Sequence, residues 1–208
     1  MTIKVKICGI TRKEDALCAL ESGADYFGLV FYKKSPRYIT RERAKEIIDF
    51  LRTQGISAPP AIGVFVNEEI PRVRQSIEDL GLFAAQLHGE ESPDYCADLS
   101  HRAIKAFRVR DADTLRMMKD YNVWACLCDA FHQVLPGGTG KRIDASLLTP
   151  YIPMHRIFLA GGLSPENISL VLETIKPFAV DVSTGVESEP GIKDPVKIRS
   201  FIAAVKGA

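Results

Sequence analysis

The feature that most constrains the fold is an alternation of short apolar, β-branched runs with longer amphipathic segments along the chain. Short runs of this kind, bounded by turn residues, are typical of strands, whereas apolar residues spaced three and four apart are typical of helices. Strands that alternate with helices favour a parallel sheet built from βα units. The strand pattern occurs eight times, at residues 3–8, 26–31, 61–66, 83–88, 103–108, 123–128, 156–161 and 178–183.

The segments between these runs carry recognisable helix ends. Ser164 with Pro165, and Asp194 with Pro195, are pairs typical of a helix cap followed by its first turn. The helical segments after the first three strands are each followed by a glycine, which is common just beyond a helix: Gly23, Gly55 and Gly81.

Eight βα units in 208 residues predict an α/β fold, a parallel eight-stranded (β/α)8 TIM barrel that forms a single domain over residues 1–208. The alternative is an open, doubly wound sheet, in which a phosphate-binding loop usually follows the first strand. In this chain the glycine-rich turns follow the seventh and eighth strands, which favours the barrel.

The charge and the cysteine content exclude several classes of function. A formal net charge of +1 gives no electrostatic reason to expect nucleic acid or a membrane surface as a partner. No apolar run is long enough to span a bilayer, and the N-terminus lacks the pattern of a signal peptide. Five irregularly spaced cysteines do not suggest a disulfide framework. We therefore expect a reduced, cytoplasmic protein.

Chemically useful residues follow the predicted strands. In such a barrel the active site lies at the C-terminal ends of the strands, so residues there should converge. One or two of them could be simple caps or turn residues, but that explanation does not suit the whole set. In strand order the set is Cys8, Arg37, Asn67, His88, Arg108, Asp129, the turn 161–164 and the turn 183–185.

Cys8 is the strongest candidate for a reactive residue. Alternation along the first strand turns Ile3, Val5 and Ile7 toward the helices and Lys6 and Cys8 into the barrel. The Lys6 ammonium below the thiol should favour the thiolate and lower the pKa of Cys8. The competing interpretation is a buried, inert cysteine, which is a common fate of this residue type.

Two further strands hold candidates of different kinds. Asp129 faces inward at the end of the sixth strand, where a buried carboxylate needs a partner or a task. Cys126 and Cys128 face the helices and predict core packing rather than a metal site. Lys105, in the fifth strand, could form a Schiff base, but we favour a lumen-filling lysine paired with a carboxylate.

The late glycine-rich turns predict a phosphate site. Backbone amides in such turns bind anions, and barrels frequently hold phosphate after strands seven and eight. The turns are "LAGGLSPEN" and "DVSTGVE", and a third, "PGGTGK" (136–141), follows strand six. A phosphorylated small-molecule ligand is therefore expected.

At this point the motifs resemble those of phosphoribosylanthranilate isomerase, an enzyme family of tryptophan biosynthesis. The resemblance runs in order from residue 4 to about residue 194. It implies an Amadori rearrangement of N-(5-phosphoribosyl)anthranilate by general acid-base catalysis, without a cofactor or metal. The motifs that carry it are "KICGIT", "GLVFYKKSPRYI", "GVFVNE", "QLHGEE", "PGGTGK", "LAGGLSPENI" and "DVSTGVESEPGIKD".

The resemblance also implies roles for individual residues. Asp129 is similar to the general acid that protonates the ribose ring oxygen, and Cys8 to the general base that removes the C2 proton. Arg37 is similar to the arginine that holds the anthranilate carboxylate, while His88 and Asp181 match positions that line the substrate. The positions that match the phosphate-binding turns are Gly161, Gly162, Ser183, Thr184 and Gly185.

Three rival functions stay open. A sugar-phosphate isomerase with two aspartates would need a carboxylate in place of Cys8. A Schiff-base aldolase would use Lys105, and a non-catalytic phosphometabolite-binding barrel would not need both Cys8 and Asp129. Activity on the related imidazole-carboxamide substrate of histidine biosynthesis is also open. So is the oligomeric state, with a monomer favoured.

Overall fold

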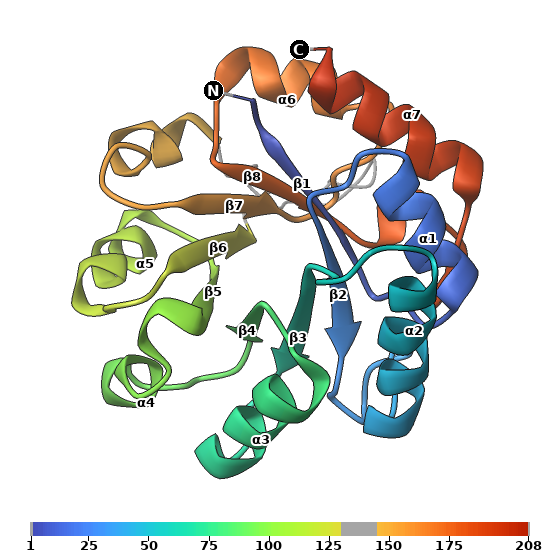
Figure 1. Ribbon diagram of the computed structural model, residues 1–208. Coiled ribbons are helices and arrows are strands. Elements are labelled where there is room, and N and C mark those ends of the chain that lie inside the picture. The colour runs from blue at the N-terminus through green and yellow to red at the C-terminus, as the bar shows by residue number, and fades with distance from the viewer. Residues whose placement is uncertain (1, 130–144, 208) are drawn as a thin grey trace.

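The computed structural model describes residues 2–129 and 145–207, which form a closed barrel of eight parallel strands (Figure 1). The strands pair in chain order, and β1 closes the barrel by pairing with β8. The predicted parallel (β/α)8 barrel is confirmed, and each strand begins and ends within two residues of its expected bounds. The strands are β1 Lys4–Cys8, β2 Tyr26–Val30, β3 Ala61–Phe65, β4 Ala84–Leu87, β5 Ala103–Arg108, β6 Ala125–Asp129, β7 Ile157–Ala160 and β8 Ala179–Val182.

Helices of unequal length surround the barrel. The long ones cover the side formed by β1, β2, β3 and β8, and short α-helical and 3-10 segments cover the rest (Figure 1). Among the described residues, no helix combines the length and the apolar character needed to cross a bilayer. The α-helices are α1 Lys13–Glu21, α2 Arg41–Thr53, α3 Ile70–Leu80, α4 Pro93–Ala97, α5 Ala112–Arg116, α6 Ile168–Thr174 and α7 Pro195–Lys206. The 3-10 segments are η1 Ser100–Arg102, η2 Met117–Asp120, η3 Ala145–Tyr151 and η4 Thr184–Val186.

Most of the expected helix ends are confirmed, and one is wrong. The glycine after each of the first three helices has a positive φ, and Gly81 (φ 65°) is the left-handed C-cap of α3. Asp194 caps α7 by accepting from two backbone amides. The helix expected to begin at Ser164 begins at Ile168 instead. The side chain of Asn167 explains this difference. Its Oδ1 accepts a hydrogen bond from Ser164 N and its Nδ2 donates to Gly162 O, and these bonds hold the segment as a turn.

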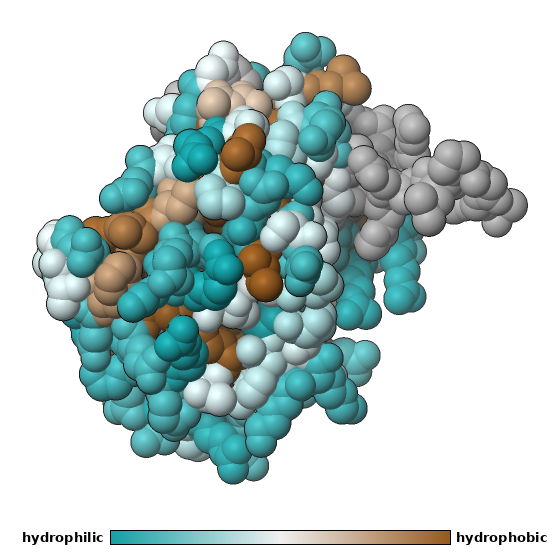
Figure 2. Space-filling view, turned by 90° about the vertical axis from the view of Figure 1, so that its right-hand side faces the viewer, coloured by the Kyte–Doolittle hydropathy of each residue, from teal (hydrophilic) through white to brown (hydrophobic). Residues whose placement is uncertain are grey.

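The barrel has two apolar layers on opposite faces of the strands. Val5 and Ile7 point outward into the main core between strands and helices, as expected. The helices contribute one face to this core, and the side of the molecule seen in Figure 2 is largely hydrophilic with small apolar patches. The interior is filled by a second cluster, which consists of Ile62, Ala84, Ile104, Ala125, Leu127, Phe158, Ala160 and Ala179.

A small hairpin follows β8, and the sequence pattern did not predict it. Its antiparallel strands are β9 Glu187–Glu189 and β10 Ile192–Lys193. The turn between them contains Gly191, whose φ of 85° lies in the left-handed region that favours glycine. Its backbone carbonyl accepts a hydrogen bond from Thr11 Oγ1, which ties the hairpin to the segment after β1.

Candidate active site

Cys8 and Lys6 lie side by side inside the barrel, as alternation predicted. Cys8 ends β1 and is 8% exposed, and Lys6 is fully buried one layer below. Gly28 on β2 pairs with Cys8, and a Cβ added to it would lie 2.8 Å from Cys8 Sγ and 3.1 Å from Lys6 Nζ. The missing side chain of Gly28 therefore makes room for the thiol and the ammonium together. Gly9, with a φ of 78°, then turns the chain and leaves the thiol at the rim.

The electrostatic surroundings of Cys8 differ from the expectation. Burial raises the pKa of the Cys8 thiol, while the charge of Lys6 and its hydrogen bond lower it, and the net shift is upward. Lys6 Nζ is already paired with Asp181 Oδ1 at 2.9 Å, and the Asp181 carboxylate itself raises the pKa of the thiol. The predicted lowering of the Cys8 pKa is therefore wrong. The Lys6 ammonium is paired with Asp181, so its lowering effect on the Cys8 pKa is smaller than the raising effect of burial.

Asp181 reaches the interior from β8. It pairs in register with Lys6 across the β1–β8 ladder and is 9% exposed. Its side chain accepts a hydrogen bond from the Lys6 ammonium, and its charge also acts directly on the nearby thiol. Its expected place beside a substrate stays a prediction.

Asp129 ends β6 on the inward face, as predicted. Leu127 and Ala125, two and four residues earlier, belong to the interior cluster. Asp129 Oδ1 is buried and, within the described part of the chain, has no hydrogen-bond partner. An unpaired buried oxygen costs about 1–3 kcal/mol, which a ligand hydroxyl placed there would offset.

The outward-facing residues of β6 pack in the core between the strands and the helices. Cys126 and Cys128 are buried in the outer core, as expected, and burial raises the pKa of Cys126 to about 12. In residues 2–129 and 145–207, no cluster of three or more histidine, cysteine or carboxylate side chains could hold a metal ion.

His88 follows β4 and is held by a residue that sequence reasoning missed. Gln86, on the same inward face, lies with Nε2 at 2.9 Å from His88 Nδ1. Burial lowers the pKa of His88, although the carboxylates of Asp181 and Asp129 oppose this shift. The imidazole is therefore neutral at pH 7, with one ring nitrogen tied to the amide. The spacing of two residues in "QLH" was the signal that could have revealed Gln86.

Arg37, in the loop after β2, is paired with a carboxylate. Its Nε and Nη2 donate to Glu187 Oε1 and Oε2 at 2.8 and 2.6 Å. A Cβ added to Gly9 would lie 2.8 Å from Arg37 Cδ, so the arginine crosses directly over the turn that follows Cys8. Glu187 was not among the predicted site residues, because it lies in the unpredicted hairpin.

The two glycine-rich turns after β7 and β8 pack against each other. Gly161 and Gly162 have φ values of 100° and 71°, which side chains rarely adopt. A Cβ on Gly185 would lie 2.0 Å from the backbone oxygen of Leu163, so only glycine permits this approach. Ser183 Oγ in turn lies close to Gly9. The predicted phosphate-binding turns are thus neighbours beside the thiol, whereas the third turn, 136–141, lies outside the described residues.

Lys105 lies away from this group. It shares a strand face with Phe107, a member of the outer core, whereas the adjacent Ile104 belongs to the interior cluster. Its ammonium bonds Glu91 Oε2 at 2.9 Å and the carbonyl of Gly89 at 2.7 Å. The expected carboxylate partner is confirmed, and the expected place in the lumen is wrong. This position argues against a Schiff base formed inside the barrel.

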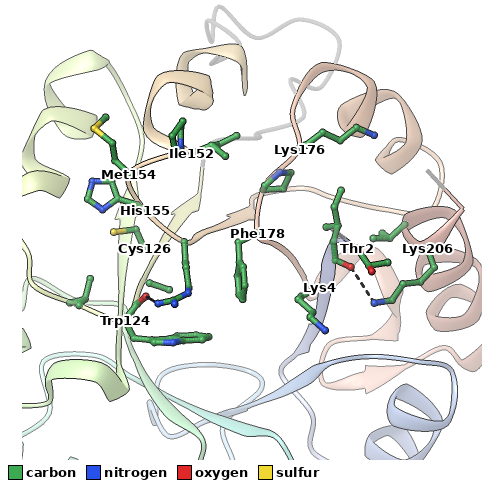
Figure 3. Close-up of a pocket in the computed structure, with 17 residues that line it drawn as sticks. Thr2, Lys4, Trp124, Cys126, Ile152, Met154, His155, Lys176, Phe178 and Lys206 are labelled. Carbon is green, nitrogen blue, oxygen red and sulfur yellow. Dashed lines mark hydrogen bonds between the residues drawn. The ribbon is translucent and has the colours of Figure 1, made fainter.

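A wide cavity of about 1350 Å³ lies at the opposite end of the barrel, at the N-terminal ends of the strands (Figure 3). Trp124, Phe178, Lys4, His155 and Lys206 are among the residues that line it. None of the described lining residues is acidic, and neither Cys8 nor Asp129 reaches it. The wide cavity and the acid-base residues therefore lie at opposite ends of the barrel. We assign the candidate active site to the end that holds Cys8 and Asp129.

Comparisons with known proteins agree on one family. The family model described as N-(5'-phosphoribosyl)anthranilate (PRA) isomerase matches residues 5–204. A protein named N-(5'-phosphoribosyl)anthranilate isomerase from Trichlorobacter lovleyi is 48% identical over 210 residues, which cover 99% of both chains.

Solved structures give the same result. One describes mutually generated monomers of the dimeric phosphoribosylanthranilate isomerase of Thermotoga maritima. It is 40% identical, covers 100% of both chains and has a TM-score of 0.84. Another phosphoribosyl anthranilate isomerase, 40% identical with a TM-score of 0.83 and the same coverage, was solved in complex with reduced 1-(o-carboxyphenylamino)-1-deoxyribulose 5-phosphate.

Proposed function

The chain belongs to the N-(5'-phosphoribosyl)anthranilate isomerase family, and on this premise we propose how its own residues carry out the reaction. The protein is an isomerase of tryptophan biosynthesis. It converts N-(5-phosphoribosyl)anthranilate into 1-(2-carboxyphenylamino)-1-deoxyribulose 5-phosphate by an Amadori rearrangement. The single observation that supports the residue assignment best is the inward convergence of Cys8 and Asp129 at the loop end of one barrel.

The first proposed step is ring opening by Asp129. The acid donates a proton to the ribose ring oxygen, the bond from this oxygen to C1 breaks, and the anthranilate nitrogen forms an iminium with C1. Within the described residues Asp129 Oδ1 has no hydrogen-bond partner, and this supports the role, because the protonated carboxyl can donate from this atom to a ring oxygen placed there. The neutral His88 nearby adds no positive charge that would oppose the iminium.

The second proposed step is removal of the C2 proton by Cys8. The product is an enolamine, which gains a proton at C1 and loses the proton of its C2 hydroxyl group, giving the ketone at C2. Burial raises the pKa of the free thiol, so the resting site favours the protonated form. The cationic iminium formed in the first step lowers the pKa of a thiol beside it, as Lys6 already does. The base is thus activated when its substrate is ready to lose a proton.

The two anionic ends of the substrate are assigned to two parts of the site. Arg37 holds the anthranilate carboxylate, a task that suits a planar guanidinium. The phosphate is held by the packed turns after β7 and β8, whose glycines bring backbone amides close to the ligand. Asp181, in register with Lys6 on the neighbouring strand, holds the lysine ammonium by a hydrogen bond. Proton transfers complete the rearrangement, so we propose that neither a metal nor a cofactor takes part.

A direct assay tests the function. The purified chain is mixed with phosphoribosylanthranilate, and the loss of anthranilate-type fluorescence is followed over time. We expect multiple turnovers without added metal or cofactor. A protein that only binds the compound would leave the fluorescence signal stable after the first mixing, and that result would contradict the proposal.

Three broader proposals complete this assignment. We propose that residues 1–208 act as one catalytic domain and that the enzyme works in the cytoplasm. A monomer stays our prediction for the oligomeric state, although the Thermotoga maritima relative is described as dimeric. Size-exclusion chromatography with light scattering distinguishes the two states.

A further inference from the structure

Glu187 is a buried carboxylate beside the site that accepts hydrogen bonds from four donor atoms. It is 8% exposed and accepts from Arg37 Nε and Nη2, from Lys193 Nζ at 2.9 Å and from the amide of Gly191 at 3.2 Å. Burial raises the pKa of Glu187, but the bonds and charges of Arg37 and Lys193 outweigh it and leave the pKa below its usual value. The carboxylate is therefore ionised and held from both sides.

This pairing leaves a defined part of Arg37 for a ligand. A guanidinium has five N–H donors, and Glu187 occupies the edge formed by Nε and Nη2. Within the described residues, Nη1 has no acceptor, and the side chain stays 19% exposed. The second edge, between Nη1 and Nη2, can thus bind a carboxylate through two parallel bonds.

Lys193 connects this arginine to the phosphate side of the site. Its fully buried ammonium donates to Glu187 Oε1 and also, at 3.1 Å, to the backbone carbonyl of Ser183 in the turn after β8. The backbone of Lys193 is fixed separately, because its amide donates to Asp15 Oδ2. One lysine therefore joins the turn assigned to phosphate and the carboxylate that holds Arg37.

Stability alone does not explain this arrangement. Burying charges is costly, and replacing a buried ion pair with apolar residues is often neutral or stabilising. Two cations and a carboxylate at the rim of a catalytic site therefore suggest a task that depends on their geometry. Their position between the two expected anion-binding points of the substrate indicates what this task is.

We propose that Glu187, supported by Lys193, is a positioning residue that aims the free edge of Arg37 at the substrate carboxylate and fixes its distance from the phosphate turn. This inference rests on the proposed function. Glu187 itself does not touch the substrate in this scheme. It acts through Arg37, so its effect should depend on whether the substrate carries a carboxylate.

The test compares two substrates in the Glu187→Gln variant. One is phosphoribosylanthranilate, and the other is N-(5-phosphoribosyl)aniline, which lacks the carboxylate. We expect kcat/KM for the first to fall roughly 10-fold to 100-fold, mostly through KM, because a misplaced binding group has effects of that order. The value for the aniline compound should change less than about threefold. Equal losses for both substrates, or no loss for either, would overturn the proposal.

A double-mutant cycle and two matched controls sharpen this result. In an Arg37→Ala background, Glu187→Gln should no longer alter the ratio of the two kcat/KM values. Glu91→Gln breaks another buried lysine–carboxylate pair, with Lys105, and should lower stability without altering that ratio. Glu189→Gln, an exposed change in the same hairpin, should leave the ratio and the stability unchanged. A shift of the ratio in Glu91→Gln would show a general structural effect and contradict the proposal.

Misfolding of Glu187→Gln and failure of the proposed function each give a result distinct from failure of this inference. If Glu187→Gln does not fold, because Lys193 loses its charge partner, Glu187→Asp keeps the charge and shortens the side chain by one methylene. The same selective loss is expected, and an unchanged ratio in a folded Glu187→Asp protein would overturn the proposal. Failure of the proposed function itself would be visible earlier, as a wild-type chain that turns over neither substrate.

Discussion

The two ends of the barrel are built from the same eight strands but differ in almost every chemical respect. At the N-terminal end, Tyr26, Trp124, Phe158 and Phe178 contact one another through their rings, with centroids 5.7–6.3 Å apart. At the C-terminal end the interior holds a thiol, carboxylates, ammonium groups and close glycine turns. The wide cavity lies at the aromatic end, so an opening in the surface is a poorer guide to chemistry than the residues around it.

The physical reason for this division lies in parallel strand geometry. Every strand delivers its last inward residue to the same end, and the loops that follow can converge there. The N-terminal end receives the residues at the start of the strands. Here several of these residues are aromatic, and their side chains pack against one another and stabilise the barrel. The comparison therefore predicts that changes at one end alter catalysis and changes at the other alter stability.

The largest expected effect is on the chemical step. Cys8→Ala and Asp129→Asn should each lower kcat by roughly 10² to 10⁴-fold, because each removes one proton-transfer group. Substrate should still bind, and thermal unfolding should show that the barrel is intact. Near-native turnover by Cys8→Ala would contradict the assignment of the base and remove the main difference between the two ends.

A smaller effect is expected at the carboxylate-binding position. Arg37→Ala should raise KM roughly 10-fold to 100-fold and change kcat less, because it removes a charged, two-bond contact with the substrate. Steady-state kinetics with the fluorescent substrate measure both constants. A fall confined to kcat would indicate that Arg37 acts on the chemical step instead.

A still smaller effect concerns the pH dependence of the thiol. Burial raises the pKa of Cys8, so its alkylation by iodoacetamide in the ligand-free enzyme should still increase with pH above the pKa of free cysteine. Below its pKa the rate should change about tenfold per pH unit, since only the thiolate reacts. Peptide mass spectrometry separates Cys8 from the half-buried Cys18. An alkylation midpoint at a pH below the pKa of free cysteine would contradict this prediction and support the lowered Cys8 pKa expected from the sequence.

The smallest effect on activity is expected at the aromatic end. Phe178→Ala should leave kcat and KM unchanged while lowering the free energy of unfolding by about 2 kcal/mol, less than the cost for a fully buried phenylalanine. The reason is that Phe178 is only half-buried, though its ring contacts Trp124 and Phe158. Urea denaturation measures the stability. A large loss of activity in a folded variant would show that the two ends are coupled.

Much of the fold could be predicted because it depends on local pattern. Eight short apolar runs determine the strands, and alternation within β1 and β6 placed Cys8 and Asp129 on the inward face. Where a side chain decided the local structure, prediction was weaker. The side-chain bonds of Asn167 to Ser164 N and Gly162 O hold an expected helix start as a turn, and the hairpin after β8 has strands too short to show a pattern.

The sequence by itself determined the strand count, the inward face of the catalytic candidates and the family to which the chain belongs. Only the tertiary structure decided which charges meet. Lys6 with Asp181 joins residues 175 positions apart, and Arg37 with Glu187 joins residues 150 positions apart. Neither pairing follows from spacing along the chain. The raised pKa of Cys8 has the same origin, because it reflects burial and a carboxylate on the neighbouring strand, which exist only once the barrel closes.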